Sequence, residues 1–118
     1  MNIGFKLHKV LDLIVYTIIP EDDNYSILHR FTDTGWTPKK IQTIIDGIEE
    51  SKTKPKGEEY IWANEDVRLY SNENAVVLMD DLAARGGEDN PDNLYLKLTH
   101  IEMLTFLQDF KSFVEENS

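Results

Sequence analysis

Residues 58–81 read EEYIWANEDVRLYSNENAVVLMDD, and this stretch decides the fold. Three short runs rich in β-branched and aromatic residues alternate here with two triplets rich in Asn and Asp: 60–63, Asn64-Glu65-Asp66, 67–71, Asn72-Glu73-Asn74 and 75–79. Asn and Asp tolerate left-handed backbone conformations and are typical of tight turns between strands. The spacing therefore predicts two consecutive antiparallel hairpins, which together form a three-stranded meander.

The segment that follows the meander predicts one more strand and a helix. Leu94, Leu96 and Leu98 alternate with polar or aromatic neighbours, which is typical of a half-buried strand. Thr99 and Glu102 have the spacing of a capping box, which marks a helix start. Apolar residues then recur with the helical period, which predicts a helix of about 99–116 packed on the sheet; they are Met103, Phe106, Leu107, Phe110, Phe113 and Val114.

The sequence before the meander predicts two strands, 1–7 and 11–19, joined by His8-Lys9-Val10. The apolar run 10–19 is interpreted as the mostly buried central strand of a sheet. The run 25–31 fits a strand, although Ile27, Leu28 and Phe31 also fit one or two helical turns; we interpret it as a strand.

A second helix is predicted from the next residues. Residues 32–36 form a loop, and Thr37-Pro38 supplies a hydroxyl N-cap followed by proline at the first helical position. Four isoleucines then repeat at i, i+3, i+4 and i+7, which predicts an amphipathic helix to about residue 51 whose last turn Gly47 weakens: Ile41, Ile44, Ile45 and Ile48. The sum is one α+β domain over 1–118, a mainly antiparallel sheet with a meander and two packed helices, about 37–51 and 99–116.

Composition excludes several classes of protein. The 118 residues include no cysteine, which excludes disulfide scaffolds, thiol catalysis and cysteine-based zinc sites, and which is compatible with the cytoplasm. The apolar run 10–19 contains Asp12 and is half the length of a spanning helix, so neither a membrane segment nor a secretory signal is expected.

The charge points to a basic protein as partner. Twenty-two acidic and twelve basic residues give a net charge of −10, which argues against binding nucleic acid through its phosphates. The negative charge is dense in residues 80–93, which we interpret as a loop with five acidic residues and only Arg85 as a base.

No motif of catalysis, cofactor binding or metal binding is present in the sequence, so we expect no catalytic residue, no cofactor and no metal. The pair Asp80-Asp81 is the most enzyme-like feature, but neighbours on an extended chain point to opposite faces and do not converge on one ion. An enzyme would need a concave site that gathers Asp80 or Asp81 with His29 or His100. A binding protein is the better interpretation.

Interface chemistry is concentrated in the second half of the chain. The meander carries Trp62 and Tyr70, which are either core residues or aromatic anchors for a partner. Together with the acidic loop they form the expected partner-binding set: Trp62, Tyr70, Asp80, Asp81, Glu88, Asp89 and Asp92.

The order of meander, acidic loop and terminal helix, LYLKLTHIEMLTFLQDFKSFVEEN over 94–117, resembles immunity proteins of bacterial contact-dependent growth inhibition systems. A small uncharacterised bacterial family shares this layout. The similarity covers about residues 58–117 and transfers no site residue by residue. It implies a cytoplasmic inhibitor that binds one cognate toxin domain, often a nuclease, and blocks its active site or its substrate surface. The alternative is a stand-alone housekeeping or regulatory domain that binds another basic protein. The oligomeric state stays open.

Overall fold

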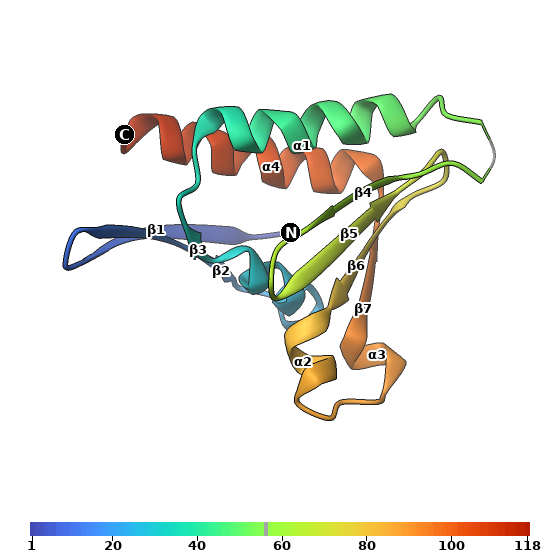
Figure 1. Ribbon diagram of the computed structural model, residues 1–118, viewed down its shortest axis with the longest axis horizontal. Coiled ribbons are helices and arrows are strands. Elements are labelled where there is room, and N and C mark those ends of the chain that lie inside the picture. The colour runs from blue at the N-terminus through green and yellow to red at the C-terminus, as the bar shows by residue number, and fades with distance from the viewer. Residues whose placement is uncertain (56) are drawn as a thin grey trace.

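The computed structural model describes residues 1–55 and 57–118 and confirms the α+β, mainly antiparallel class (Figure 1). In this part of the chain the strands form two sheets, where the sequence predicts one. The first has the order β1-β2-β3 and the second the order β4-β5-β6-β7. The strands are β1 (Ile3–Val10), β2 (Leu13–Pro20), β3 (Asp33–Thr34), β4 (Tyr60–Ala63), β5 (Val67–Ser71), β6 (Val76–Asp80) and β7 (Tyr95–Leu98).

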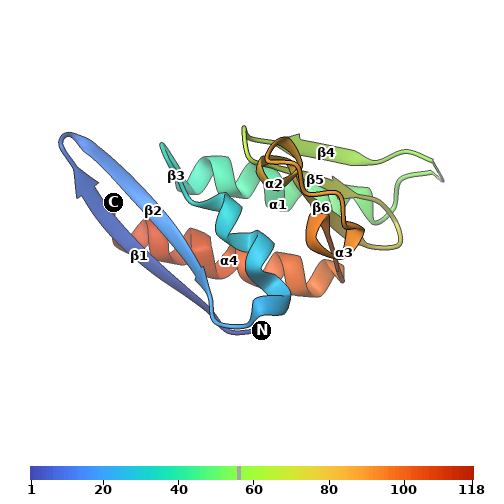
Figure 2. The same cartoon turned by 90° about the horizontal axis from the view of Figure 1, so that it is seen from below.

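The helical elements connect and cover these sheets. They are the 3-10 helix η1 (Asp23–Phe31), α1 (Pro38–Ser51), α2 (Asp81–Arg85), α3 (Pro91–Leu94) and α4 (His100–Glu116). The two long helices, α1 and α4, pack against each other along their lengths, and η1 lies between the two sheets (Figures 1 and 2). In the described residues, no helix combines the length and the apolar character that crossing a membrane requires.

The run 25–31 is helical, so its interpretation as a strand is wrong and the alternative spacing is the one that the chain adopts. The Asp22 carboxylate caps η1 by accepting a hydrogen bond from the backbone N–H of Asn24. Ile27, Leu28 and Phe31 are all buried and face the core from one side of this helix. Because η1 takes the place of the expected strand, the first hairpin cannot continue into the meander, and two sheets result.

The first hairpin is present, but its turn lies at Leu11-Asp12 and not at residues 8–10. Val10 pairs with Leu13 across this two-residue turn, and Leu11 has a positive φ of 58°. β2 is central in its sheet, as predicted, yet it is not mostly buried, since only Tyr16 and Ile18 are. The strand alternates because one face packs on the protein and the other is open.

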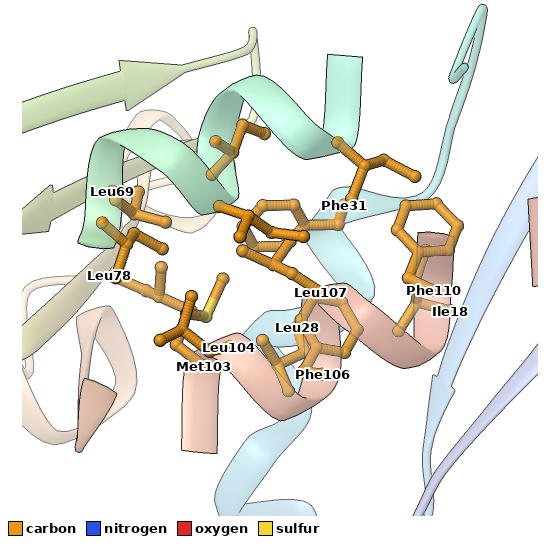
Figure 3. Packing of buried hydrophobic residues seen from close by; sticks show 14 of the residues in the cluster. Ile18, Leu28, Phe31, Leu69, Leu78, Met103, Leu104, Phe106, Leu107 and Phe110 are labelled. Carbon is orange, nitrogen blue, oxygen red and sulfur yellow. The ribbon is translucent and has the colours of Figure 1, made fainter. Parts of the chain in front are cut away.

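The predicted meander is confirmed, and β7 extends it to four strands. The register pairs Trp62 with Leu69, Leu69 with Leu78, and Leu78 with Leu96, so these side chains share one face. That face packs on α1, α4 and η1, and Figure 3 shows Leu69 and Leu78 beside Met103 and Leu104 of α4. The opposite face of this sheet, which we call the open face, presents Arg68, Tyr70, Val77, Met79 and Tyr95.

Residues 80–93 are not a plain loop, because they contain α2 and α3. The Asp80 carboxylate caps α2 by accepting from the backbone N–H of Ala83 (2.9 Å). The Asn90 side chain caps α3, and Pro91 occupies its first turn. Helices of five and four residues have no apolar period, so their cap residues are their only signal in the sequence.

The two long helices begin as predicted. Thr37 caps α1, and Thr99 and Glu102 form a capping box at α4, where the Tyr25 hydroxyl also donates to Glu102 (3.1 Å). These hydrogen bonds, the backbone bond of Thr99 first, hold the pKa of Glu102 below its ordinary value. The carboxylate therefore stabilises the start of α4 at neutral pH and loses this effect as the pH falls through its lowered pKa.

Rings from both sheets meet on α4 and form an aromatic cluster. Phe31 of η1 stacks on Trp62 of β4 with ring centroids 5.3 Å apart and planes 8° apart. Phe31 also meets Phe106 of α4 edge to face at 5.6 Å, and Phe110 stacks on Phe5 of β1 at 5.5 Å. The cluster thus connects elements from the whole length of the chain.

Gly47 allows α1 to approach the second sheet closely. A Cβ atom at this position would lie 2.3 Å from Cζ of Tyr60, which is far inside van der Waals contact. One turn later, the buried hydroxyls of Ser51 and Ser71 form a hydrogen bond of 2.7 Å between α1 and β5. Glycine at position 47 therefore destabilises the helix by itself, but it is needed because no side chain fits between α1 and Tyr60.

We expect Gly47→Ala to lower the free energy of unfolding by about 1–3 kcal/mol, because it overpacks Tyr60. An exposed glycine in a helix would instead gain about 1 kcal/mol from the same change. Urea denaturation measures the difference, and Gly47→Ala combined with Tyr60→Ala is the control that removes the clash. A Gly47→Ala variant more stable than the parent protein would contradict this account.

Candidate functional site: an acidic hollow

The negative charge is unevenly distributed along the chain. Residues 57–98, which contain the second sheet with α2 and α3, hold ten acidic and three basic residues, a net charge of −7. Residues 1–56 hold eight of each sign and are neutral overall. The sheet with its two short helices is therefore the acidic half of the molecule.

A polar hollow of about 570 Å³ lies where η1, α3 and the second sheet meet. Four carboxylates, those of Asp23, Asp80, Glu88 and Asp92, line it together with one cation, Arg30. We call it the acidic hollow. Three of its carboxylates belong to the predicted partner-binding set, whereas Asp23 and Arg30 come from η1.

Asp80 forms the fixed floor of the acidic hollow. Its side chain is 7% exposed and accepts two hydrogen bonds from Nε of Arg30, at 3.0 and 3.1 Å. It also caps α2 through Ala83. The carboxylate is neutralised by Arg30 and accepts from two donors, Nε of Arg30 and the N–H of Ala83, so the buried Asp80 positions Arg30 and α2 and is not free to bind a ligand.

Asp81 faces the other way, as expected for a neighbour at the end of a strand. It accepts from Nε of Arg68 at 2.9 Å, and Nη1 of Arg68 donates to the Tyr70 hydroxyl at 2.9 Å. Hydrogen bonding and the charge of Asp81 raise the pKa of Arg68 above its ordinary value. The structure thus places Asp81 and Tyr70 together on the open face, away from the acidic hollow.

The remaining predicted residues lie in three different places. Glu88 and Asp92 line the acidic hollow, and Glu88 accepts a hydrogen bond from Nδ2 of Asn93 (2.8 Å). Asp89 is exposed on the segment between α2 and α3. Trp62 is half-buried on the packed face and lines a separate hollow of about 390 Å³ with Trp36 and Ile44. The alternation of side chains along a strand predicts that Trp62 and Tyr70 lie on opposite faces of the sheet. It does not predict which of the two faces the core.

Sequence reasoning missed Asp23 and Arg30 as members of the site. Arg30 lies in the run that the sequence favours as a strand, and Asp23 lies just before it; their position beside residues 80–93 depends on the helical form of η1. The sequence does contain a signal for a helix start at this point. Asp22 and Asp23 precede an apolar run, and acidic residues are favoured at the start of a helix.

The geometry that an enzyme would need is met only in part. His29 and Asp80 line a common hollow of about 420 Å³, together with Asp22 and Asp23. However, Nδ1 of His29 donates to the Ile18 carbonyl at 2.8 Å, and Asp80 is held by Arg30. Nε2 of His100 donates to the Asn72 carbonyl at 2.6 Å, on another side of the molecule.

In the part of the chain that the structure describes, no three His, Asp or Glu side chains are arranged to hold a metal ion. Comparison with protein-family models, with curated proteins and with solved structures finds no match for this chain. The chemistry of the acidic hollow therefore carries the functional argument.

We expect Asp80→Asn to lower the free energy of unfolding by about 1–3 kcal/mol, because it breaks the largely buried ion pair with Arg30. The asparagine can still cap α2, so the loss reports the ion pair. Asp81→Asn is the matched comparison, since Arg68 is 41% exposed, and its cost should stay below about 1 kcal/mol. Urea denaturation at pH 7 tests both. An equal loss in the free energy of unfolding for both variants would contradict the structural role of Asp80.

Proposed function

We propose that this chain is an immunity protein, which binds a basic cognate toxin domain in the cytoplasm and blocks its active site or substrate surface. One observation carries the proposal. Residues 57–98 have a net charge of −7 and supply three of the four carboxylates that line the acidic hollow. The resemblance of residues 58–117 to immunity proteins agrees with this chemistry.

The acidic hollow fits the side chain of a lysine or an arginine. Asp80 is satisfied by Arg30, so Asp23, Glu88 and Asp92 supply the uncompensated charge at its rim. Carboxylates bind guanidinium and ammonium groups through charge-assisted hydrogen bonds, which are stronger than neutral ones. A nuclease domain presents such cations, because it must bind phosphates.

The distribution of charge also favours fast association. A field of one sign steers an oppositely charged partner toward its surface and raises the association rate, and salt weakens this effect. The Debye length is about 8 Å at physiological ionic strength, so salt screens the charges that lie farther than this from the partner. Only the charges near the contact surface then attract it. Those charges lie in the second sheet and in α2 and α3.

The test is co-expression with the product of the adjacent reading frame, the expected toxin. The triple variant Asp23→Asn, Glu88→Gln, Asp92→Asn should weaken binding by about tenfold or more, flatten its salt dependence and abolish growth rescue. The matched control carries the same change of charge on the exposed side of α1: Asp46→Asn, Glu49→Gln, Glu50→Gln. It should bind and rescue like the parent protein.

Two results would contradict the proposal. If the hollow variant and the control bind the toxin equally well, the acidic hollow is not the contact surface. If the neighbouring product does not bind at low salt and the chain instead recovers a basic housekeeping protein, the alternative of a regulatory binding domain replaces the immunity function.

A further inference from the structure

The β1–β2 hairpin, residues 3–20, forms an arm with an exposed tip. All seven residues from 8 to 14 are exposed. Four of them are large and apolar: Val10 is 55% exposed, Leu11 95%, Leu13 58% and Ile14 36%. Figures 1 and 2 show the arm on the side away from the second sheet, with its tip beyond the C-terminal end of α4. Water-exposed apolar side chains at this density mark an interaction site.

The protein's own core takes side chains of the arm as far out as Leu7 and Tyr16. Phe5 packs against Phe110 and Phe113 of α4, in both cases with ring centroids 5.5 Å apart. Tyr16 and Ile18 are buried on the same side of the sheet. The hairpin is thus anchored as far as Tyr16, whereas Val10, Leu11 and Leu13 of its tip stay more than half exposed within one molecule.

Leu11 is unfavourable in the free chain for two reasons. Its φ of 58° lies in the left-handed region, at the first position of a two-residue turn where hairpins favour glycine. This conformation is unfavourable for an L-residue with a side chain. The same leucine also leaves an apolar side chain in water. Burial of this side chain against another molecule would offset both penalties.

The charges of the two copies favour contact through the arms over contact through the acidic halves. The arm holds Lys6 and Lys9 against Asp12, a net charge of +1, whereas the rest of the chain sums to −11. Two copies that meet through their acidic halves would repel each other. Two copies that meet arm to arm avoid this repulsion, and Asp12 of one arm can reach a lysine of the other.

The edge of the arm supports the same contact. β1 is eight residues long and has β2 as its only strand partner in the described structure, which leaves its other edge free. A free edge can pair with an identical strand in antiparallel fashion, and such pairing obeys the two-fold symmetry that most homodimers have. When this pairing is centred on the outer end of β1, the two identical apolar tips lie against each other across the axis.

We propose that this protein forms a two-fold dimer through its arms, with the β1 edges paired and the tips Val10, Leu11, Leu13 and Ile14 buried. This surface is separate from the acidic hollow. Sedimentation velocity between about 10 µM and 1 mM should show conversion of the 13.7 kDa chain into a dimer as concentration rises.

The decisive variant is Leu11→Gly, which removes the side chain and relieves the positive φ. It should raise the dissociation constant of the dimer by about tenfold or more, because a buried leucine is lost from each copy. It should also raise the melting temperature of the dilute monomer, a gain that no loss of intramolecular packing could produce. Ile101→Gly in α4, which is 75% exposed, is the control for loss of an apolar surface residue and should leave association unchanged.

Three results would overturn the dimer: a monomer at every concentration, association that Leu11→Gly leaves unchanged, or growth into open-ended oligomers. The outcome is independent of the immunity function. The Leu11→Gly variant should still neutralise the toxin, and the variant of Asp23, Glu88 and Asp92 should still dimerise. If the hollow variant loses dimerisation and Leu11→Gly does not, the acidic half is the self-association surface and the arm is not.

Discussion

The stacked contact between Phe31 and Trp62 holds the two halves of this protein together. Phe31 belongs to η1, which follows the first sheet, and Trp62 belongs to the edge strand of the second sheet. Phe106 and Phe110 of α4 close the cluster from the helical side. Each aromatic ring buries a large apolar surface, and stacked and edge-to-face pairs add to that burial. The aromatic cluster thus forms much of the core that the two small antiparallel sheets share.

The cluster also determines which surfaces remain for partners. Because η1 packs between the sheets, its polar side brings Asp23 and Arg30 against residues 80–93, and the acidic hollow results. Because α4 packs on the first hairpin only as far as Tyr16, the tip of the arm stays exposed. The two surfaces differ in chemistry: one is polar and strongly acidic, and the other is apolar with a small positive charge. They can therefore serve different contacts.

The sequence predicts the elements whose patterns are long or strongly marked. The meander has turn residues at regular spacing, and α1 and α4 have both caps and a helical period. The interpretation of the run 25–31 as a strand is wrong, because seven residues with two possible periods carry too little information, and tertiary packing decides between them. The Leu11-Asp12 turn has no glycine or asparagine, the residues that most strongly mark a two-residue hairpin turn. Of the site, Glu88 and Asp92 follow from the charge pattern, whereas Asp23 and Arg30 depend on contacts between distant segments.

The central claim is that the acidic half, and specifically the hollow between η1 and α3, contacts a basic protein. Hydrogen–deuterium exchange of the chain, alone and bound to the product of the adjacent reading frame, tests it most directly. The account predicts slower exchange in residues 23–30 and 80–95 on binding, with residues 38–51 of α1 unchanged. Protection confined to α1, or no protection in residues 80–95, would contradict it.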